Sequence, residues 1–83
     1  MTDQPATTRR PVVAMLLFPW VTDIDVIGPW AELAFDCDVH LIWKDRQPLQ
    51  SDTGLTLVPT NTLTECPADV DVLLVPGERV RLG

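Results

Sequence analysis

The sequence has few basic residues and no long apolar run, and both absences limit what the protein can bind. Six lysines and arginines stand against twelve aspartates and glutamates, which gives a formal net charge of -6 over 83 residues. A chain with this charge repels the phosphates of nucleic acids and the headgroups of anionic lipids. No apolar stretch approaches the roughly 20 residues of a membrane span. We therefore expect neither a nucleic acid nor a membrane as partner.

A signal peptide and a metal-binding motif are also missing. Residues 1–11 form a polar leader without the apolar segment that secretion requires, which predicts a cytoplasmic location. Cys37 and Cys66 form no C-x-x-C pair, and the C-x-x-H spacing from Cys37 to His40 lacks the second ligand pair of a zinc site. We expect two reduced, buried cysteines, a histidine within a strand, and no metal.

Three short apolar runs are what the sequence does contain. Runs of this length, rich in β-branched residues and bounded by proline or polar turns, are typical of strands that are buried on both faces of a parallel sheet. The runs are Val12–Phe18, Val39–Trp43 and Val70–Val75.

The segment Thr22–Phe35 has the pattern of a helix. Thr22 and Asp25 have the spacing of a capping box, in which the side chains of the cap and of the third residue bond each other's backbone. Gly28–Pro29 interrupts the segment, so the helix either kinks there or begins its second part at the proline. The apolar residues expected on one face are Ile24, Ile27, Ala31, Ala34 and Phe35.

The remaining segments predict smaller elements. Leu49 and Leu55–Val58 predict a short hairpin, and Asn61 or Thr62 predicts the cap of a single helical turn that ends before Pro67. Strands that alternate with helices are typical of an α/β domain with a parallel sheet. Ligands of such domains bind at the carboxyl ends of the strands, so we expect a site after the last strand.

Several short motifs, in their order and spacing, resemble the PfpI-type family of the class I glutamine-amidotransferase-like superfamily. Within that family the resemblance is to the isonitrile hydratase branch, and it extends over residues 12–77. The motifs are Leu16–Pro19, Val21-x-x-x-Asp25, Gly28–Pro29, Val39–Lys44, Ser51-x-x-Gly54-Leu55, Cys66–Pro67 and Val75–Gly77.

The resemblance implies a fold and a reaction. The fold is the N-terminal part of a flavodoxin-like, three-layer α/β/α sandwich, in a domain more than twice as long as this chain. The reaction is the addition of water to an isonitrile, which gives an N-substituted formamide without a metal or organic cofactor. The implied partners are a small-molecule substrate and a second copy of the chain in a homodimer.

The same resemblance implies roles for particular residues. A cysteine on a tight turn, later in the sequence than this chain reaches, attacks the substrate. Asp25 assists the thiol or the water as a catalytic acid, and Gly77 lies in a turn whose backbone N–H groups hold developing negative charge. From the residues alone, Asp25 is better explained as the acid of a helix cap, and it is the resemblance that favours the active-site role. The three tryptophans are candidates to line a pocket, although Trp43 is better explained as a core residue because it lies in an apolar strand. They are Trp20, Trp30 and Trp43.

The chain also departs from the family. Trp20 stands where the family usually has glycine, Ala31 stands where it has an acid, and Glu78 stands where it has a second glycine. The likeness ends at Gly77, so we interpret residues 78–83 as an aberrant tail produced by a frameshift. We therefore expect the chain to be inactive alone. Two other functions stay open, a ligand-sensing domain of a transcriptional regulator and a small interaction protein.

Overall fold

The computed structural model describes residues 10–77, which form one helix and six strands. The helix joins the first two strands, and the three longest strands lie in the segments that the sequence predicts. The elements are β1 (Val12–Leu16), α1 (Ile24–Leu33), β2 (Asp38–Trp43), β3 (Leu49–Gln50), β4 (Thr56–Leu57), β5 (Asn61–Thr62) and β6 (Val72–Leu74).

The main sheet has the strand order β5-β2-β1-β6, and every pair in it is parallel. The central strand is β1, since Val13 pairs with Val39 of β2 on one side and with Val72 of β6 on the other. The strands β3 and β4 form a separate antiparallel hairpin, as the sequence predicts. The expected α/β fold with a parallel sheet is therefore confirmed.

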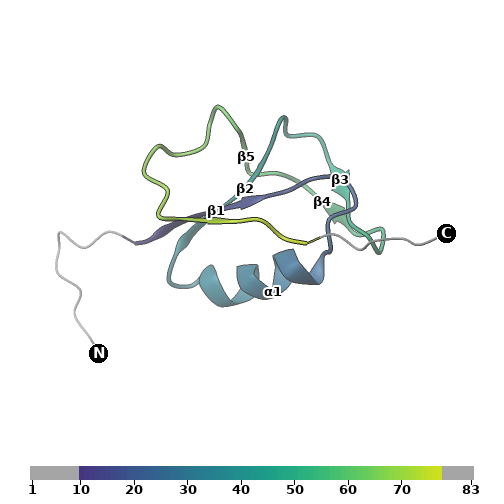
Figure 1. The fold of residues 1–83 in the computed structure, drawn as a ribbon, viewed down its shortest axis with the longest axis horizontal. Coiled ribbons are helices and arrows are strands. Elements are labelled where there is room, and N and C mark those ends of the chain that lie inside the picture. Colours follow the sequence, from purple (N-terminus) through teal and green to yellow (C-terminus); the bar gives the residue numbers. More distant parts are fainter. Residues whose placement is uncertain (1–9, 78–83) are drawn as a thin grey trace.

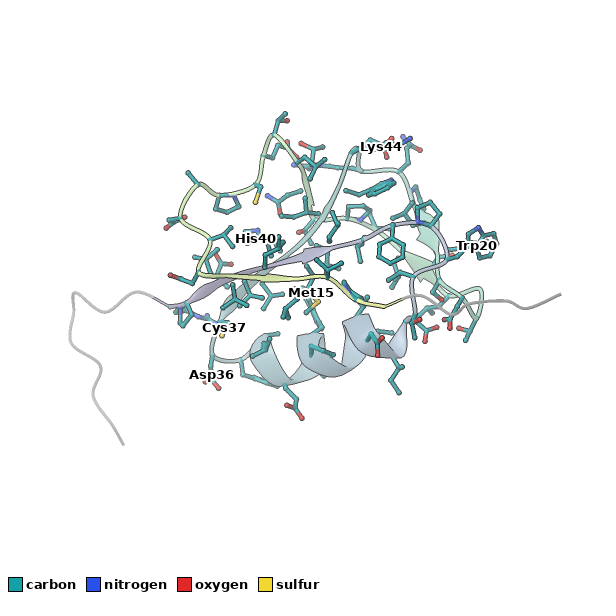
Figure 2. The ribbon with its side chains drawn as sticks, in the orientation of Figure 1. Met15, Trp20, Asp36, Cys37, His40 and Lys44 are labelled. Carbon is teal, nitrogen blue, oxygen red and sulfur yellow. The ribbon has the colours of Figure 1, made fainter. Side chains whose placement is uncertain are left out.

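The helix α1 covers one face of the sheet, and the chain between β5 and β6 passes over the opposite side (Figure 1). Met15 of β1 points towards α1, and His40 of β2 points away from it (Figure 2). Within residues 10–77, α1 is neither long nor apolar enough to cross a membrane. The core lies between α1, the sheet and the hairpin, and its buried residues are Met15, Leu17, Val21, Val26 and Leu49.

The helix face predicted from the sequence is wrong. Ile24 is 70% exposed and Phe35 is 86% exposed, whereas Val26 is buried and Trp30 packs against the core. The helix carries two apolar stripes, and the spacing alone does not tell which one faces the sheet. The short connection through buried Val21 fixes the rotation of the helix and so selects the stripe that contains Val26.

The predicted capping box is also wrong. The N-cap is Asp23, one residue later than expected, and its side chain makes no capping hydrogen bond. The backbone N–H of Thr22, which a capping box would bond to the side chain of Asp25, donates instead to the carbonyl of Gly77 at 3.0 Å. Pro29 lies inside α1 without ending it, although proline removes one hydrogen bond of the helix.

The C-terminal end of α1 is held by Arg10. Its Nη2 atom donates to the carbonyls of Ala34, Phe35 and Cys37 at 3.1, 3.1 and 2.9 Å. These carbonyls lie at or just beyond the end of the helix, where a cation interacts favourably with the helix dipole. Arg10 therefore belongs to the folded unit, although the sequence assigns it to the polar leader. Residues 1–9 of that leader lie outside the described residues.

The helical turn expected after Asn61 is a strand followed by a turn. Asn61 and Thr62 form β5 beside β2. The expected cap is nevertheless present, because Thr62 N donates to Glu65 Oε1 at 2.8 Å and Glu65 N donates to Thr62 Oγ1 at 3.3 Å. The hydrogen bond from the Thr62 backbone and that from the Arg46 side chain lower the pKa of Glu65. The sequence found the cap and missed the strand pairing.

His40 lies in β2, as expected, and links this strand to β5. Its Nδ1 lies 2.9 Å from Asn61 Oδ1, and its Nε2 lies 3.0 Å from Asp38 Oδ2. Within the described part of the chain, no group of three or more His, Cys, Asp or Glu side chains is arranged to hold a metal ion. Cys37 and Cys66 are free thiols, and both are half-buried where full burial was expected.

Candidate functional site

The candidate site lies at the carboxyl ends of β1 and β6. The chain leaves β1, crosses a short loop and enters α1, while the turn after β6 comes to rest beside the start of that helix. The hydrogen bond from Thr22 N to Gly77 O, at 3.0 Å, joins the two segments. Residues 55 positions apart in the sequence are thus brought together where a parallel sheet presents its ligand site.

Asp25 and Gly77, the two residues that the family resemblance singles out, meet at this edge. A Cβ placed on Gly77 would stand 3.2 Å from Oδ2 of Asp25, which is closer than ordinary van der Waals contact. Both residues are exposed to solvent within the part of the chain that the structure describes. The carboxylate therefore borders the turn closely only because glycine has no side chain. Their catalytic roles stay predictions.

A shallow depression of about 290 Å³ surrounds this pair. Its walls are apolar, and Asp25 contributes the one charged side chain among its lining residues. Binding sites for small molecules commonly combine apolar walls with a few polar groups that fix the orientation of the ligand. The lining residues are Ile24, Asp25, Pro29, Leu74, Val75, Pro76 and Gly77.

The hairpin β3–β4 braces the start of α1 through a buried serine. Ser51 Oγ donates to Asp23 Oδ2 at 2.8 Å and accepts the backbone N–H of Leu55 at 3.1 Å. The hydroxyl of Thr53 also donates to Asp23 Oδ2, and Asp23 N donates to Asp52 Oδ1 at 3.2 Å. The role of Asp23 was not predicted from the sequence. The sequence does contain a signal for it. Asp23 lies two residues before Asp25, at the N-terminal end of the helix, where aspartate is a preferred residue.

The hairpin is joined to the loop before α1 as well. Trp20 N donates to Gln50 O at 2.8 Å, and Asp52 N donates to Val21 O at 2.9 Å. The loop is therefore fixed from the hairpin on one side and from Gly77 on the other. Asp25 follows this loop directly, so the same bonds set the position of its carboxylate.

Trp20 adopts a backbone conformation that favours glycine. Its φ is +68°, and it is the one non-glycine residue with positive φ among residues 10–77. A side chain in this left-handed region crowds the following carbonyl. Glycine, which the family resemblance implies at this position, adopts this conformation without such crowding. The indole of Trp20 is 57% exposed and points away from the body of the protein (Figure 2).

The tryptophans do not line the depression. Trp43 packs against the core, as the core interpretation predicts, and the ammonium of Lys44 lies 5.9 Å from the centroid of its ring. Trp30 packs against the same core from α1. Glu78, which replaces a glycine of the family, lies outside the described residues.

The sequence pattern of the DJ-1/PfpI family matches residues 11–81. Isonitrile hydratase from Pseudomonas putida is 49% identical over 67 residues, which cover 78% of this chain and 29% of that enzyme. The chain therefore spans less than a third of that enzyme's length.

Two solved structures have the same fold. A THiJ/PfpI family protein from Pseudomonas syringae superposes with a TM-score of 0.79 and is 31% identical in sequence. The superposition covers 94% of this chain and 36% of the Pseudomonas syringae protein. A DJ-1 superfamily protein from Agrobacterium tumefaciens superposes with a TM-score of 0.66 over 82% of this chain and 38% of the Agrobacterium protein. The two sequences are 22% identical, so this similarity supports the fold alone. The flavodoxin-like part of the expected fold is confirmed, and this chain belongs to the DJ-1/PfpI family.

Proposed function

We propose that residues 12–77 form the N-terminal part of an isonitrile-hydrating enzyme, in which the carboxyl group of Asp25 transfers a proton to or from the reacting atoms. The observation that carries this proposal is the contact between Asp25 and Gly77 in an apolar depression at the carboxyl edge of the sheet. The similarity to Pseudomonas putida isonitrile hydratase supports the choice of substrate.

The reaction consumes one isonitrile and one water and gives one N-substituted formamide. A thiolate adds to the isonitrile carbon, and the adduct takes up a proton. Water then adds across the C=N bond of the adduct, so that its oxygen bonds to the carbon, one of its protons ends on the nitrogen and the other returns to the carboxylate. The C–S bond breaks as the formamide forms, and the sulfur leaves as the thiolate that began the reaction. A carboxyl group close to the sulfur serves both proton transfers, because it donates in the first step and accepts in the second.

The residues of this chain would hold the substrate and move the proton. The apolar walls formed by Ile24, Leu74 and Val75 suit the organic substituent of an isonitrile, because they exclude water from it. The missing side chain at Gly77 leaves room for the substrate beside Asp25. The attacking sulfur belongs to a later part of the domain, since neither Cys37 nor Cys66 lines the depression. The 83-residue chain alone should therefore produce no formamide above background.

A hybrid enzyme tests the proposal. Residues 12–77 of this chain replace the matched stretch of the Pseudomonas putida enzyme, and formamide production is measured with a simple alkyl isonitrile. We expect turnover in the hybrid and a loss of about 100-fold or more on Asp25→Asn, which is the range for a lost acid–base catalyst. Glu32→Gln, an exposed acid on the same helix that does not line the depression, serves as the matched control. Equal turnover in the two variants would contradict the role of Asp25.

A further inference from the structure

The side chain of Asp23 is directed to the hairpin β3–β4 and not to the depression. Asp23 is not among the residues that line the depression, and its Oδ2 accepts hydrogen bonds from the hydroxyls of Ser51, at 2.8 Å, and of Thr53. Ser51 is fully buried, and its hydroxyl also accepts the N–H of Leu55 at 3.1 Å. The serine hydroxyl therefore donates one hydrogen bond and accepts another. A buried polar group that is satisfied in this way holds its partners in one arrangement.

The carboxylate of Asp25 is held by its backbone alone. Within the part of the chain that the structure describes, it accepts no hydrogen bond. The N–H of Asp25 donates to Thr22 O at 3.0 Å. The next two N–H groups, of Val26 and Ile27, donate to the carbonyl of Asp23 at 3.0 and 2.8 Å. Asp23 thus bonds to the helix turn that carries Asp25, and whatever fixes Asp23 also fixes that turn.

The position of this turn matters more for proton transfer than for substrate binding. A carboxyl group transfers a proton only at hydrogen-bond distance, and a displacement of about 1 Å can slow a reaction about 100-fold. The apolar walls of the depression contact a substrate without such directional demands. A shift of the turn that carries Asp25 should therefore slow the reaction and leave substrate binding almost unchanged.

We propose that Asp23 is a positioning residue for Asp25. The buried hydroxyl of Ser51 holds the carboxylate of Asp23, and Asp23 thereby fixes the turn from which Asp25 transfers its proton. This role rests on the function proposed above. A helix cap does not explain the residue fully, because the Asp23 side chain makes no capping hydrogen bond although aspartate is a preferred capping residue. Its carboxylate bonds to the hairpin instead, so it attaches the helix to a neighbouring element.

The hybrid enzyme described above tests this role, with kcat and KM measured on a simple alkyl isonitrile. Asp23→Ala removes the acceptor of the Ser51 hydroxyl, so kcat should fall about tenfold or more while KM changes less than about twofold. Asp23→Asn keeps an oxygen that accepts from Ser51 and should retain most of the turnover. Asp36→Ala changes an exposed acid beyond the far end of α1 (Figure 2) and should leave both constants unchanged.

A double variant separates positioning from general damage to the fold. Added to Asp25→Asn, Asp23→Ala should cause no further loss of kcat, because the group that Asp23 positions is already lost. Circular dichroism establishes that each hybrid is folded, and Ser51→Ala, which removes the same hydrogen bond from the hairpin, should lower kcat in the same way.

Three results would overturn the inference and leave the proposed function standing. They are an unchanged kcat in Asp23→Ala, an equal loss with and without the Asp25 carboxylate, and an Asp23→Asn variant as slow as Asp23→Ala. A parent hybrid that produces no formamide would overturn the proposed function and this inference with it.

Discussion

Oδ2 of Asp25 lies so close to Gly77 that a Cβ on the glycine would stand 3.2 Å from it. The pair joins the first turn of α1 to the turn that follows β6. The backbone of Gly77 is also held by Thr22, so the glycine cannot easily move aside. A substitution at either residue should therefore change the energetic effect of a substitution at the other.

Gly77→Ala should reduce the free energy of unfolding by up to about 1 kcal/mol, because the carboxylate must shift to make room and its exposure allows it to do so. Gly77 has no positive φ, so alanine is compatible with its backbone. Urea denaturation of the two single variants and of the Gly77→Ala, Asp25→Ala double variant measures the coupling. An equal loss with and without the Asp25 carboxylate would show that the two groups do not interact.

Trp20→Gly should raise the free energy of unfolding by about 1 kcal/mol. Glycine removes the crowding that a side chain meets at a φ of +68°, and the mostly exposed indole gives up little packing. Trp20→Asn should recover part of the gain, since asparagine tolerates this region better than most residues. Thermal and urea denaturation give the values. A variant less stable than the parent would mean that the indole contributes more than the strain costs.

The sequence predicted the parallel strands well because their signal is local. The apolar runs that became β1 and β2 are short, continuous and bounded by turns, so no distant contact was needed to identify them. The family resemblance placed Asp25 and Gly77 in one site, and the structure brings them together. Because Asp25 and Gly77 are far apart in the sequence, local patterns alone did not predict that they lie close together.

The errors share a physical cause, which is that contacts between distant residues decided the outcome. Val26 of α1 packs with Val21, Met15 and Leu49 in the core, and the N–H of Thr22 bonds to Gly77 in place of the Asp25 side chain. The strand β5 forms because β2 lies beside it, although the local sequence favours a capped turn. The local sequence places Arg10 in a polar leader, and only its hydrogen bond to the carbonyl of Cys37, 27 residues away, shows that it belongs to the folded unit.

Ser51→Ala should lower the free energy of unfolding by about 1–3 kcal/mol. The serine is buried, and its loss leaves the Asp23 carboxylate and the Leu55 N–H each short of one hydrogen bond. Thr53→Ala removes an exposed hydroxyl that donates to the same carboxylate, so it provides the matched control and should cost less. Urea denaturation compares the two. A larger loss for Thr53→Ala would show that the brace depends on the outer bond.

The stability of the protein should depend on the charge of His40. Burial lowers the pKa of His40, but hydrogen bonds with Asn61 and Asp38 and the attraction of Asp38 and Asp69 outweigh it, so the pKa is raised above 6.5. Since the folded state holds the proton more tightly, the stabilisation is complete below the unfolded pKa and is lost as pH rises through the folded pKa. Unfolding measured from about pH 5 to about pH 8 should show this decline.

His40→Gln is the control for that decline. Glutamine keeps a donor near Asp38 but carries no titrating group, so the fall in stability over this pH range should disappear. If the variant keeps the same pH dependence, another group is responsible.

The central place of β1 has a consequence during protein synthesis. This strand leaves the ribosome before β6, and its bond to Asp71 joins positions 59 residues apart. At roughly 5–20 residues per second, translation separates the two strands by roughly 3–12 seconds. For that time the nascent chain holds its most apolar segment with one side unpaired, and this is the interval in which a chaperone has most to protect.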